Sequence, residues 1–137
     1  MRTVTTSSVE KTQELAARFA RKLKKGDVVA LSGGLGAGKT TFVKGMARSL
    51  GVKEFVKSPT FNLLHIYQGK KFPLFHFDFY RLESCDLEEL GFEEYFYKPD
   101  GITVLEWAEK IEAALPRGVR RVSLKYVSEE KRSISFK

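Results

Sequence analysis

The stretch "LSGGLGAGKTTF", residues 31–42, decides the fold, and it contains two overlapping signatures. Its first four letters match the start of the LSGG signature of ABC transporter ATPases, whereas residues 33–40 fill every fixed position of the phosphate-loop pattern G-x-x-x-x-G-K-[ST]. In an ABC domain the signature lies far downstream of the phosphate loop and opens its own helix. Here the two overlap, so we discard the ABC interpretation and keep the phosphate loop.

The flanking residues give this loop the context that it needs. The run "DVVALSG", residues 27–33, is short and apolar, which is typical of a strand covered on both faces. After the loop, residues 39–50 predict a helix that ends at Gly51. A phosphate loop between a strand and a helix is the arrangement in which backbone amides can hold an anion.

The remaining pattern predicts a mixed α/β domain. Ser7 and Glu10 form a capping box, and apolar residues at helical spacing follow them up to Gly26. Residues 53–57 suggest a strand, residues 62–67 and 72–82 a hairpin, residues 84–97 a short helical stretch, residues 101–110 a strand running into a helix, and residues 116–137 a second hairpin. We therefore expect one domain over residues 1–137, a P-loop NTPase-like three-layer sandwich with a mixed, mainly parallel central sheet flanked by helices.

Composition limits the possible classes of protein. No apolar run reaches the roughly 18 residues of a membrane span, and the N-terminus has no signal-peptide core, so we expect a cytoplasmic protein without a membrane partner. The single cysteine, Cys85, suits a reducing compartment. The net charge of +7 favours a nucleic-acid or acidic protein partner, and it does not distinguish between the two.

The loop itself predicts a nucleotide site. Gly36 and Gly38 let the backbone turn with its amides facing inwards, and we expect residues 34–41 to surround the phosphates. In this pattern Lys39 reaches the β- and γ-phosphates, the Thr40 hydroxyl ligates Mg²⁺, and Thr41 adds a phosphate contact. The cofactors expected are therefore ATP and Mg²⁺.

Two carboxylates are candidates for the metal and for the attacking water. Asp78 ends the apolar run "LFHFD" and Glu106 ends "ITVLE", where an unpaired carboxylate would be costly to bury. One can hold Mg²⁺ while the other orients water, and the sequence leaves that division open. An ion pair between Asp78 and Arg81 is the structural alternative, and Arg81 is also a possible arginine finger.

Other residues are weaker candidates. The turn at Ser58, Pro59 and Thr60 lies where nucleotide switches place a γ-phosphate sensor, and Trp107 can stack on a ligand or fill the core. His65 and His76 lie on apolar strands and are expected to be packed. An N-K-x-D motif is absent, which argues against a Ras-type GTPase and leaves adenine as the base by elimination.

In combination, "GGLGAGKTTFVKG", "SPTF", "HFDFYRL" and "LEWAEK" resemble the TsaE (YjeE) family of small bacterial ATPases, over roughly residues 7–135. The resemblance implies an ATPase required for threonylcarbamoylation of the adenosine beside the anticodon in tRNAs that read ANN codons. It also implies a TsaB–TsaD heterodimer as partner, contact with tRNA only through that complex, and no DNA.

Carried over residue by residue, the resemblance places the family's nucleotide-binding residues at Gly36, Gly38, Lys39, Thr40 and Thr41, its switch segment at Ser58, Pro59 and Thr60, its Walker B-like acid at Asp78 and its acid–aromatic pair at Glu106 and Trp107. Together with the loop pattern, we expect nucleotide contacts from Gly34, Leu35, Gly36, Ala37, Gly38, Lys39, Thr40, Thr41, Ser58, Pro59, Thr60 and Trp107, metal binding by Thr40, Asp78 and Glu106, and catalysis by Lys39, Asp78 and Glu106. Gly34, where many members carry an acidic residue, and Ala108, often proline there, are departures. Two other functions stay open: an ATP-binding subunit that does not hydrolyse, and a small-molecule kinase.

Overall fold

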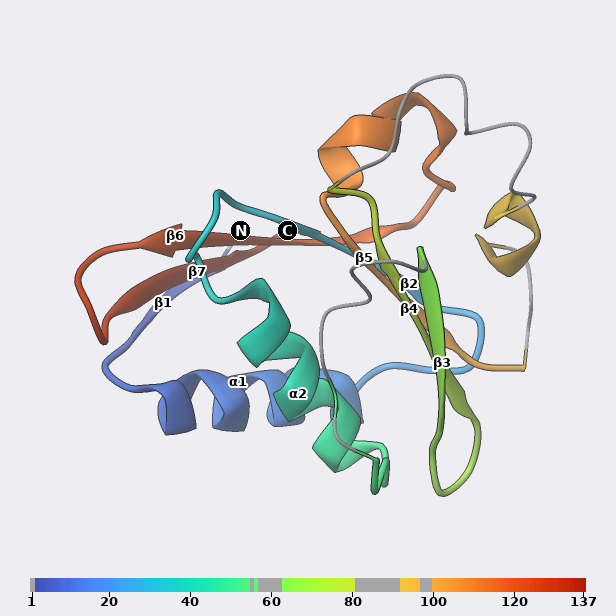
Figure 1. Ribbon diagram of the computed structural model, residues 1–137, viewed down its shortest axis with the longest axis horizontal. Coiled ribbons are helices and arrows are strands. Elements are labelled where there is room, and N and C mark those ends of the chain that lie inside the picture. The colour runs from blue at the N-terminus through green and yellow to red at the C-terminus, as the bar shows by residue number, and fades with distance from the viewer. Residues whose placement is uncertain (1, 55, 57–62, 81–91, 97–99) are drawn as a thin grey trace.

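A computed structural model describes residues 2–54, 56, 63–80, 92–96 and 100–137 (Figure 1). Cys85, Arg81 and most of the helical stretch predicted over 84–97 lie outside these residues. In the described part of the chain, none of the helices is long and apolar enough to cross a bilayer.

The strands of the described residues form one seven-stranded sheet in the order β1-β7-β6-β2-β5-β4-β3. Their bounds are β1 Arg2–Thr6, β2 Val28–Ser32, β3 Leu64–Gln68, β4 Pro73–Asp78, β5 Ile102–Glu106, β6 Arg120–Tyr126 and β7 Arg132–Phe136. The central strands β6, β2, β5 and β4 are parallel, and β1, β7 and β3 add antiparallel edges. The predicted mixed, mainly parallel sheet is confirmed, as are both hairpins.

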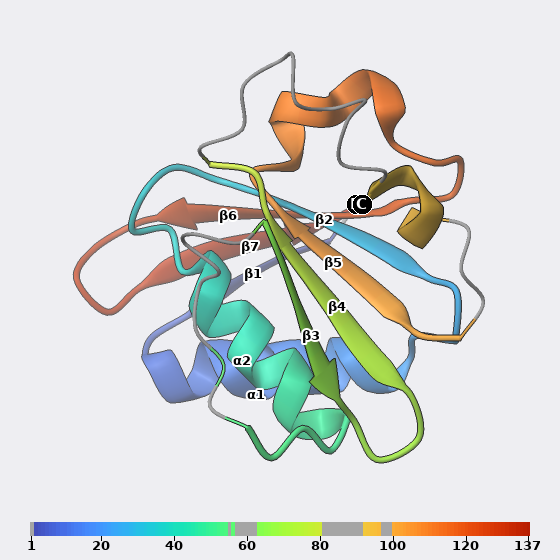
Figure 2. The same cartoon turned by 45° about the vertical axis from the view of Figure 1, so that its right-hand side comes forward.

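Helices cover both faces, but unequally. The long helices α1 (Val9–Arg21) and α2 (Lys39–Ser49) pack on one face. The other face carries the short 3-10 helices η2 (Phe92–Phe96) and η3 (Ala108–Ala114) (Figure 2). The predicted three-layer arrangement is therefore present, with one thin layer.

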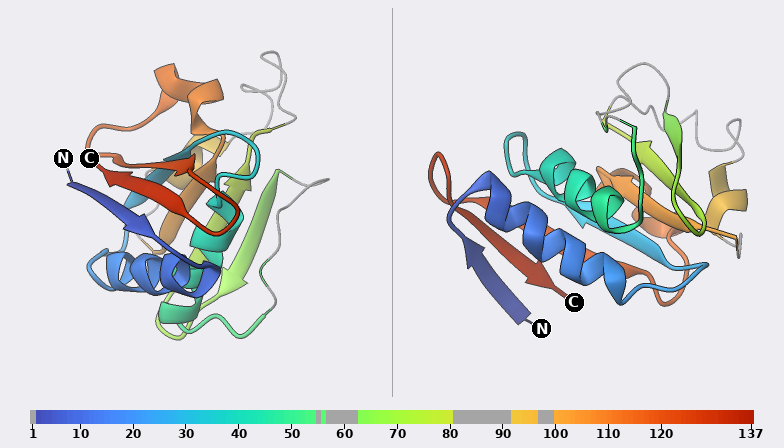
Figure 3. Two further views of the ribbon diagram at one scale, coloured as in Figure 1. Left: turned by 90° about the vertical axis from the view of Figure 1, so that its left-hand side faces the viewer. Right: turned by 90° about the horizontal axis from the view of Figure 1, so that it is seen from below.

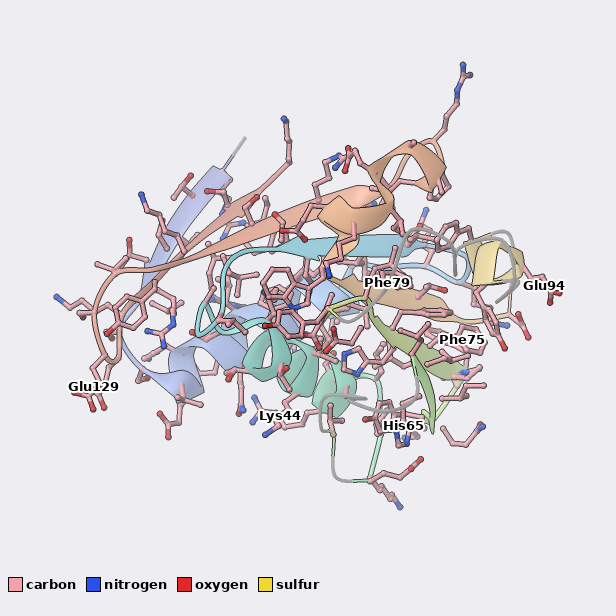
Figure 4. The ribbon with its side chains drawn as sticks, turned by 45° about the horizontal axis from the view of Figure 1, so that its top comes forward. Lys44, His65, Phe75, Phe79, Glu94 and Glu129 are labelled. Atoms are coloured by element: carbon pink, nitrogen blue, oxygen red, sulfur yellow. The ribbon has the colours of Figure 1, made fainter. Side chains whose placement is uncertain are left out.

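Alternation along the buried strands creates two cores. On β2, Val29 and Leu31 pack with the α1–α2 side, while Val28 and Ala30 pack with the 3-10 side. Side chains alternate along a strand, so residues two positions apart lie on the same face. Glu106 therefore lies on the same face of β5 as Val104, which is the face covered by α2. On the opposite face, the Phe75 ring lies 5.0 Å from that of Tyr95, beside η2 (Figure 4).

Several local predictions differ from the structure. The N-cap of α1 is Ser8, which accepts from the Lys11 amide at 3.1 Å, so the predicted cap at Ser7 is wrong by one residue. Residues 53, 54 and 56 form no strand, and the helix predicted after Glu106 is 3-10.

The N-terminal strand β1 was not predicted. It pairs with β7 from Arg2↔Phe136 to Thr6↔Arg132, which brings the two ends of the chain side by side (Figure 3). Its side chains are mostly exposed, so it lacks the apolar run that identifies a buried strand.

Candidate phosphate-binding site

The loop between β2 and α2 has the backbone of an anion site. Gly36 and Gly38 have φ values of 77° and 99°, in the left-handed region that favours glycine. A β-carbon on Gly36 would meet no atom within 4 Å, so this part of the loop faces open space. The loop leads directly into the N-terminus of α2, where unpaired amides and the helix dipole favour a phosphate.

Lys39, the first residue of α2, lies beneath the loop, with only 6% of its surface exposed. Its ammonium group donates to the carbonyl oxygens of Gly33 and, at 3.2 Å, of Gly34. The same Nζ lies 3.6 Å from the centroid of the Trp107 ring. Burial lowers the pKa of Lys39 below its ordinary value, and nearby carboxylates, Glu106 first among them, oppose that shift.

Thr40, the next residue, contacts the predicted acid at the end of β5. Its hydroxyl donates to the two carboxylate oxygens of Glu106 at 3.2 and 3.4 Å. Two residues predicted separately as metal ligands, 66 positions apart, are thus in direct contact. Parallel pairing explains this, because β2 and β5 end together and the loop turns back over both.

Glu106 is 2% exposed, and its second partner accounts for how a carboxylate is tolerated there. His76 of β4, which is fully buried, has its Nε2 atom 2.5 Å from Glu106 Oε2. The two atoms share one hydrogen bond, and the tautomer of His76 decides which of them donates. With Thr40 on one side and His76 on the other, the Glu106 carboxylate is held in a fixed position.

Asp78 lies beside Glu106, since the two residues are paired in register at the ends of β4 and β5. Its Oδ1 atom accepts from the Tyr80 amide at 2.9 Å. Both predicted carboxylates therefore reach the same edge of the sheet as the phosphate loop. The alternative contact with Arg81 lies outside the described residues.

Trp107 has the unusual backbone φ of 58°, in the left-handed region that costs a residue with a β-carbon roughly 1–2 kcal/mol. This conformation turns the chain from β5 into η3, and it places the indole over Lys39 and 4.9 Å from the Tyr80 ring. Trp107, predicted either to stack on a ligand or to fill the core, contacts the loop lysine.

These residues line a common cavity of about 480 Å³. Its lining consists of Gly34, Leu35, Gly36, Ala37, Gly38, Lys39, Thr40, Thr41, Asp78, Tyr80, Glu106, Trp107 and Arg132. Every predicted site residue of the described chain is in this set, while Ser58, Pro59 and Thr60 lie outside the described residues. Tyr80 and Arg132 were missed: Tyr80 belongs to the quoted "HFDFYRL", but Arg132 lies 92 positions after Thr40 and no sequence signal connects the two.

The residues present suit a magnesium nucleotide. A hydroxyl and two carboxylates converge at one end of a glycine-lined anion site, and Mg²⁺ prefers oxygen ligands. Among the described residues, no group of three or more His, Cys, Asp or Glu side chains is placed to hold a metal ion.

The sheet, the glycine loop and the buried lysine define a P-loop-like α/β domain. A family model described as "Threonylcarbamoyl adenosine biosynthesis protein TsaE" matches residues 6–134. The chain belongs to the TsaE family.

Individual proteins agree with this assignment. The chain is 42% identical over 131 residues to the tRNA threonylcarbamoyladenosine biosynthesis protein TsaE of Bacillus subtilis, covering 96% of this chain and 82% of the relative. It is 40% identical to the TsaE of Treponema pallidum, covering 93% and 94%. The crystal structure of Bacillus subtilis YdiB superposes with a TM-score of 0.84 at 38% identity, covering 98% of this chain and 83% of that one.

Proposed function

We propose that this protein binds and hydrolyses Mg-ATP, and that hydrolysis supports threonylcarbamoylation of the adenosine beside the anticodon in tRNAs that read ANN codons. The proposed ATPase activity is supported by the contact of Thr40 with the buried Glu106 beside the phosphate loop. Membership of the TsaE family carries the tRNA part, because the relatives are named for threonylcarbamoyladenosine biosynthesis.

In this mechanism the loop amides and Lys39 bind the phosphate oxygens. For that, the Lys39 ammonium exchanges its present partners, the carbonyls of Gly33 and Gly34 and the Trp107 ring, for phosphate. Thr40 and Asp78 are assigned to Mg²⁺, which when bound neutralises charge on the phosphate oxygens.

Glu106 is assigned to the attacking water. The water oxygen forms a bond to the γ-phosphorus, the bond to the ADP oxygen breaks, and the water proton passes to the Glu106 carboxylate. His76 keeps that carboxylate in place through its contact with Oε2. The side chain needs such an anchor because a misdirected acceptor would lose the alignment on which phosphoryl transfer depends.

We further propose that hydrolysis is slow in the isolated protein and is accelerated by a TsaB–TsaD heterodimer. The support is the family, together with the expectation that residues 58–60 act as a nucleotide switch. The protein would work in the cytoplasm, with tRNA reached only through the partner complex.

The test is phosphate release from Mg-ATP, with and without TsaB–TsaD, using Lys39→Ala as the control. We expect release to rise sharply with the partners and to vanish in the variant. ATP binding without ADP formation under either condition would leave a binding subunit and remove the assignment of Glu106. ADP without free phosphate would point instead to transfer onto another acceptor, as in a kinase.

A further inference from the structure

The β6–β7 hairpin lies against the phosphate loop. Strand β6 pairs with β2 as far as Ser32↔Ser123 and then continues to Tyr126 after β2 has ended. A β-carbon added to Gly33 would collide with the Leu124 carbonyl oxygen, and one added to Gly38 would contact the Leu124 side chain at 3.8 Å. In Figure 4 Glu129 marks the tip of this hairpin. The hairpin therefore forms one wall of the site.

Arg132, the first residue of β7, presents its side chain on that wall. Its Nη1 atom donates to the carbonyl oxygens of Ser128 at 2.7 Å and Lys131 at 2.9 Å, and its Cζ atom lies 4.7 Å from the centroid of the Tyr126 ring. Its Nε atom lies 3.7 Å from the position of a β-carbon on Gly38. The guanidinium is thus held by the hairpin, and Arg132 lines the cavity.

The topology gives a bound nucleotide its direction. Strand β2, which feeds the loop, has β5 on one side and β6 on the other. Both carboxylates, Glu106 and Asp78, lie on the β5 side. The terminal phosphate must face them if it is to be hydrolysed there, so the nucleoside end leaves the loop on the β6 side, where Arg132 lies.

We propose that Arg132, supported by the Tyr126 ring, forms the subsite for the nucleoside end, with the guanidinium plane stacked on the base. This inference rests on the proposed function, because it assumes that the loop holds a nucleotide. Arginine suits the role: it is planar and weakly hydrated, and it stacks on aromatic surfaces. The contact would let the site hold a base without the N-K-x-D motif, which the sequence lacks.

The test is calorimetric titration with two probes, Mg-ATP and magnesium tripolyphosphate, which shares the phosphate chain and lacks the nucleoside. In Arg132→Gln we expect a roughly tenfold loss of ATP affinity and unchanged tripolyphosphate affinity. Arg132→Lys should lose as much ATP affinity, because lysine keeps the positive charge but lacks the planar guanidinium group. Lys131→Gln, an exposed position in the same hairpin with the same loss of charge, is the matched control and should change neither.

Equal losses for both probes in folded Arg132→Gln would overturn the proposal in favour of a phosphate contact, and no loss would place Arg132 outside the site. A wild type that binds neither probe would overturn the proposed function as well. Should Arg132→Gln disturb the hairpin, seen as a lowered melting temperature, Tyr126→Leu keeps the carbonyl contacts of Arg132. That variant should show a smaller, ATP-specific loss, and no loss would also overturn the subsite.

Discussion

The Lys39 ammonium group has three partners within the protein. Two loop carbonyls and an indole ring surround its ammonium group, and burial lowers its pKa. A phosphate that replaces these partners brings negative charge, which raises the pKa of the bound lysine. We therefore expect nucleotide binding to be coupled to the protonation of Lys39.

This coupling predicts a pH dependence with a definite sign. Because the pKa of Lys39 in the free protein lies below the ordinary 10.5 and rises on binding, ATP binding takes up a proton once the free lysine begins to deprotonate. Affinity for Mg-ATP should be constant at lower pH and fall as the pH rises through that lowered pKa. Titrations from neutral to alkaline pH measure this. Lys39→Met should bind more weakly, with no such fall; a parallel fall in the variant would contradict the assignment.

The contact of His76 with Glu106 should contribute to the stability of the protein. His76→Leu leaves the buried Glu106 carboxylate without its closest partner. We expect the free energy of unfolding, measured in urea, to fall by about 2 kcal/mol. His76→Gln keeps an amide that can donate, so it should lose less. In a Glu106→Leu background the same His76→Leu change should cost little. Equal losses in both backgrounds would show that ring packing, and not the hydrogen bond, was removed.

The sequence predicted the residues of the site better than their partners. The spacing of the phosphate loop is local, so Lys39 and Thr40 were identifiable from adjacent letters. Asp78 and Glu106 were identifiable because each ends an apolar run. Contacts such as Glu106 with His76, or the approach of Arg132, depend on strand order and register, which no short motif contains.

Of the two neighbouring serines before α1, only Ser8 is the N-cap of the helix. The Ser8 hydroxyl caps the helix by accepting from the Lys11 amide, although the pattern of Ser7 and Glu10 resembles a capping box. We expect Ser8→Ala to lower the free energy of unfolding by about 1 kcal/mol, because an amide of the first turn loses its acceptor. Ser7→Ala, the matched control, should have little effect in the same denaturant titration; the reverse ranking would restore the capping box.

The packing of α2 against α1 depends on Gly45. A β-carbon there would collide with the Gln13 carbonyl oxygen and lie 2.7 Å from Gln13 Cα and 2.8 Å from Ala16 Cβ. Gly45→Ala should therefore destabilise by about 2 kcal/mol, because overpacking outweighs the gain of roughly 1 kcal/mol in helix propensity. Arg48→Ala, exposed on the same helix, should be nearly neutral. A stabilised Gly45→Ala would mean that the helices separate at little cost.

Elements with a strong local pattern were the predictable ones. The strands β2 and β5 consist mainly of buried apolar residues, and α1 has an apolar stripe. Strand β1 forms by pairing with the edge of β7, which is a tertiary contact. The residues of β1 themselves show no apolar run that would predict a strand. The 3-10 form of η3 follows from the left-handed Trp107 and from a break at Ile111, neither of which is encoded by helical spacing.

The order of the strands in the sheet brings the residues of the site together. The parallel strands β2, β5 and β4 direct their carboxyl ends to one edge, where ligands bind in open α/β sheets. The antiparallel β6–β7 hairpin adds a wall at that edge. Residues from position 34 to position 132 thus line one cavity, so ligand binding should stabilise the entire sheet.

Ligand binding in the cavity should raise the free energy of unfolding of the whole chain. Mg-ATP or Mg-ADP at 100 times its dissociation constant should add about 2.7 kcal/mol to the free energy of unfolding. For a chain of 137 residues, at roughly 3–4 °C per kcal/mol, this raises the melting temperature by about 10 °C. Circular dichroism and Trp107 fluorescence should report one coincident transition with and without ligand, as a single domain over residues 1–137 requires. Lys39→Ala should melt in one step as well but show almost no shift, whereas two separate transitions, only one of them shifted by nucleotide, would divide the chain into independent units.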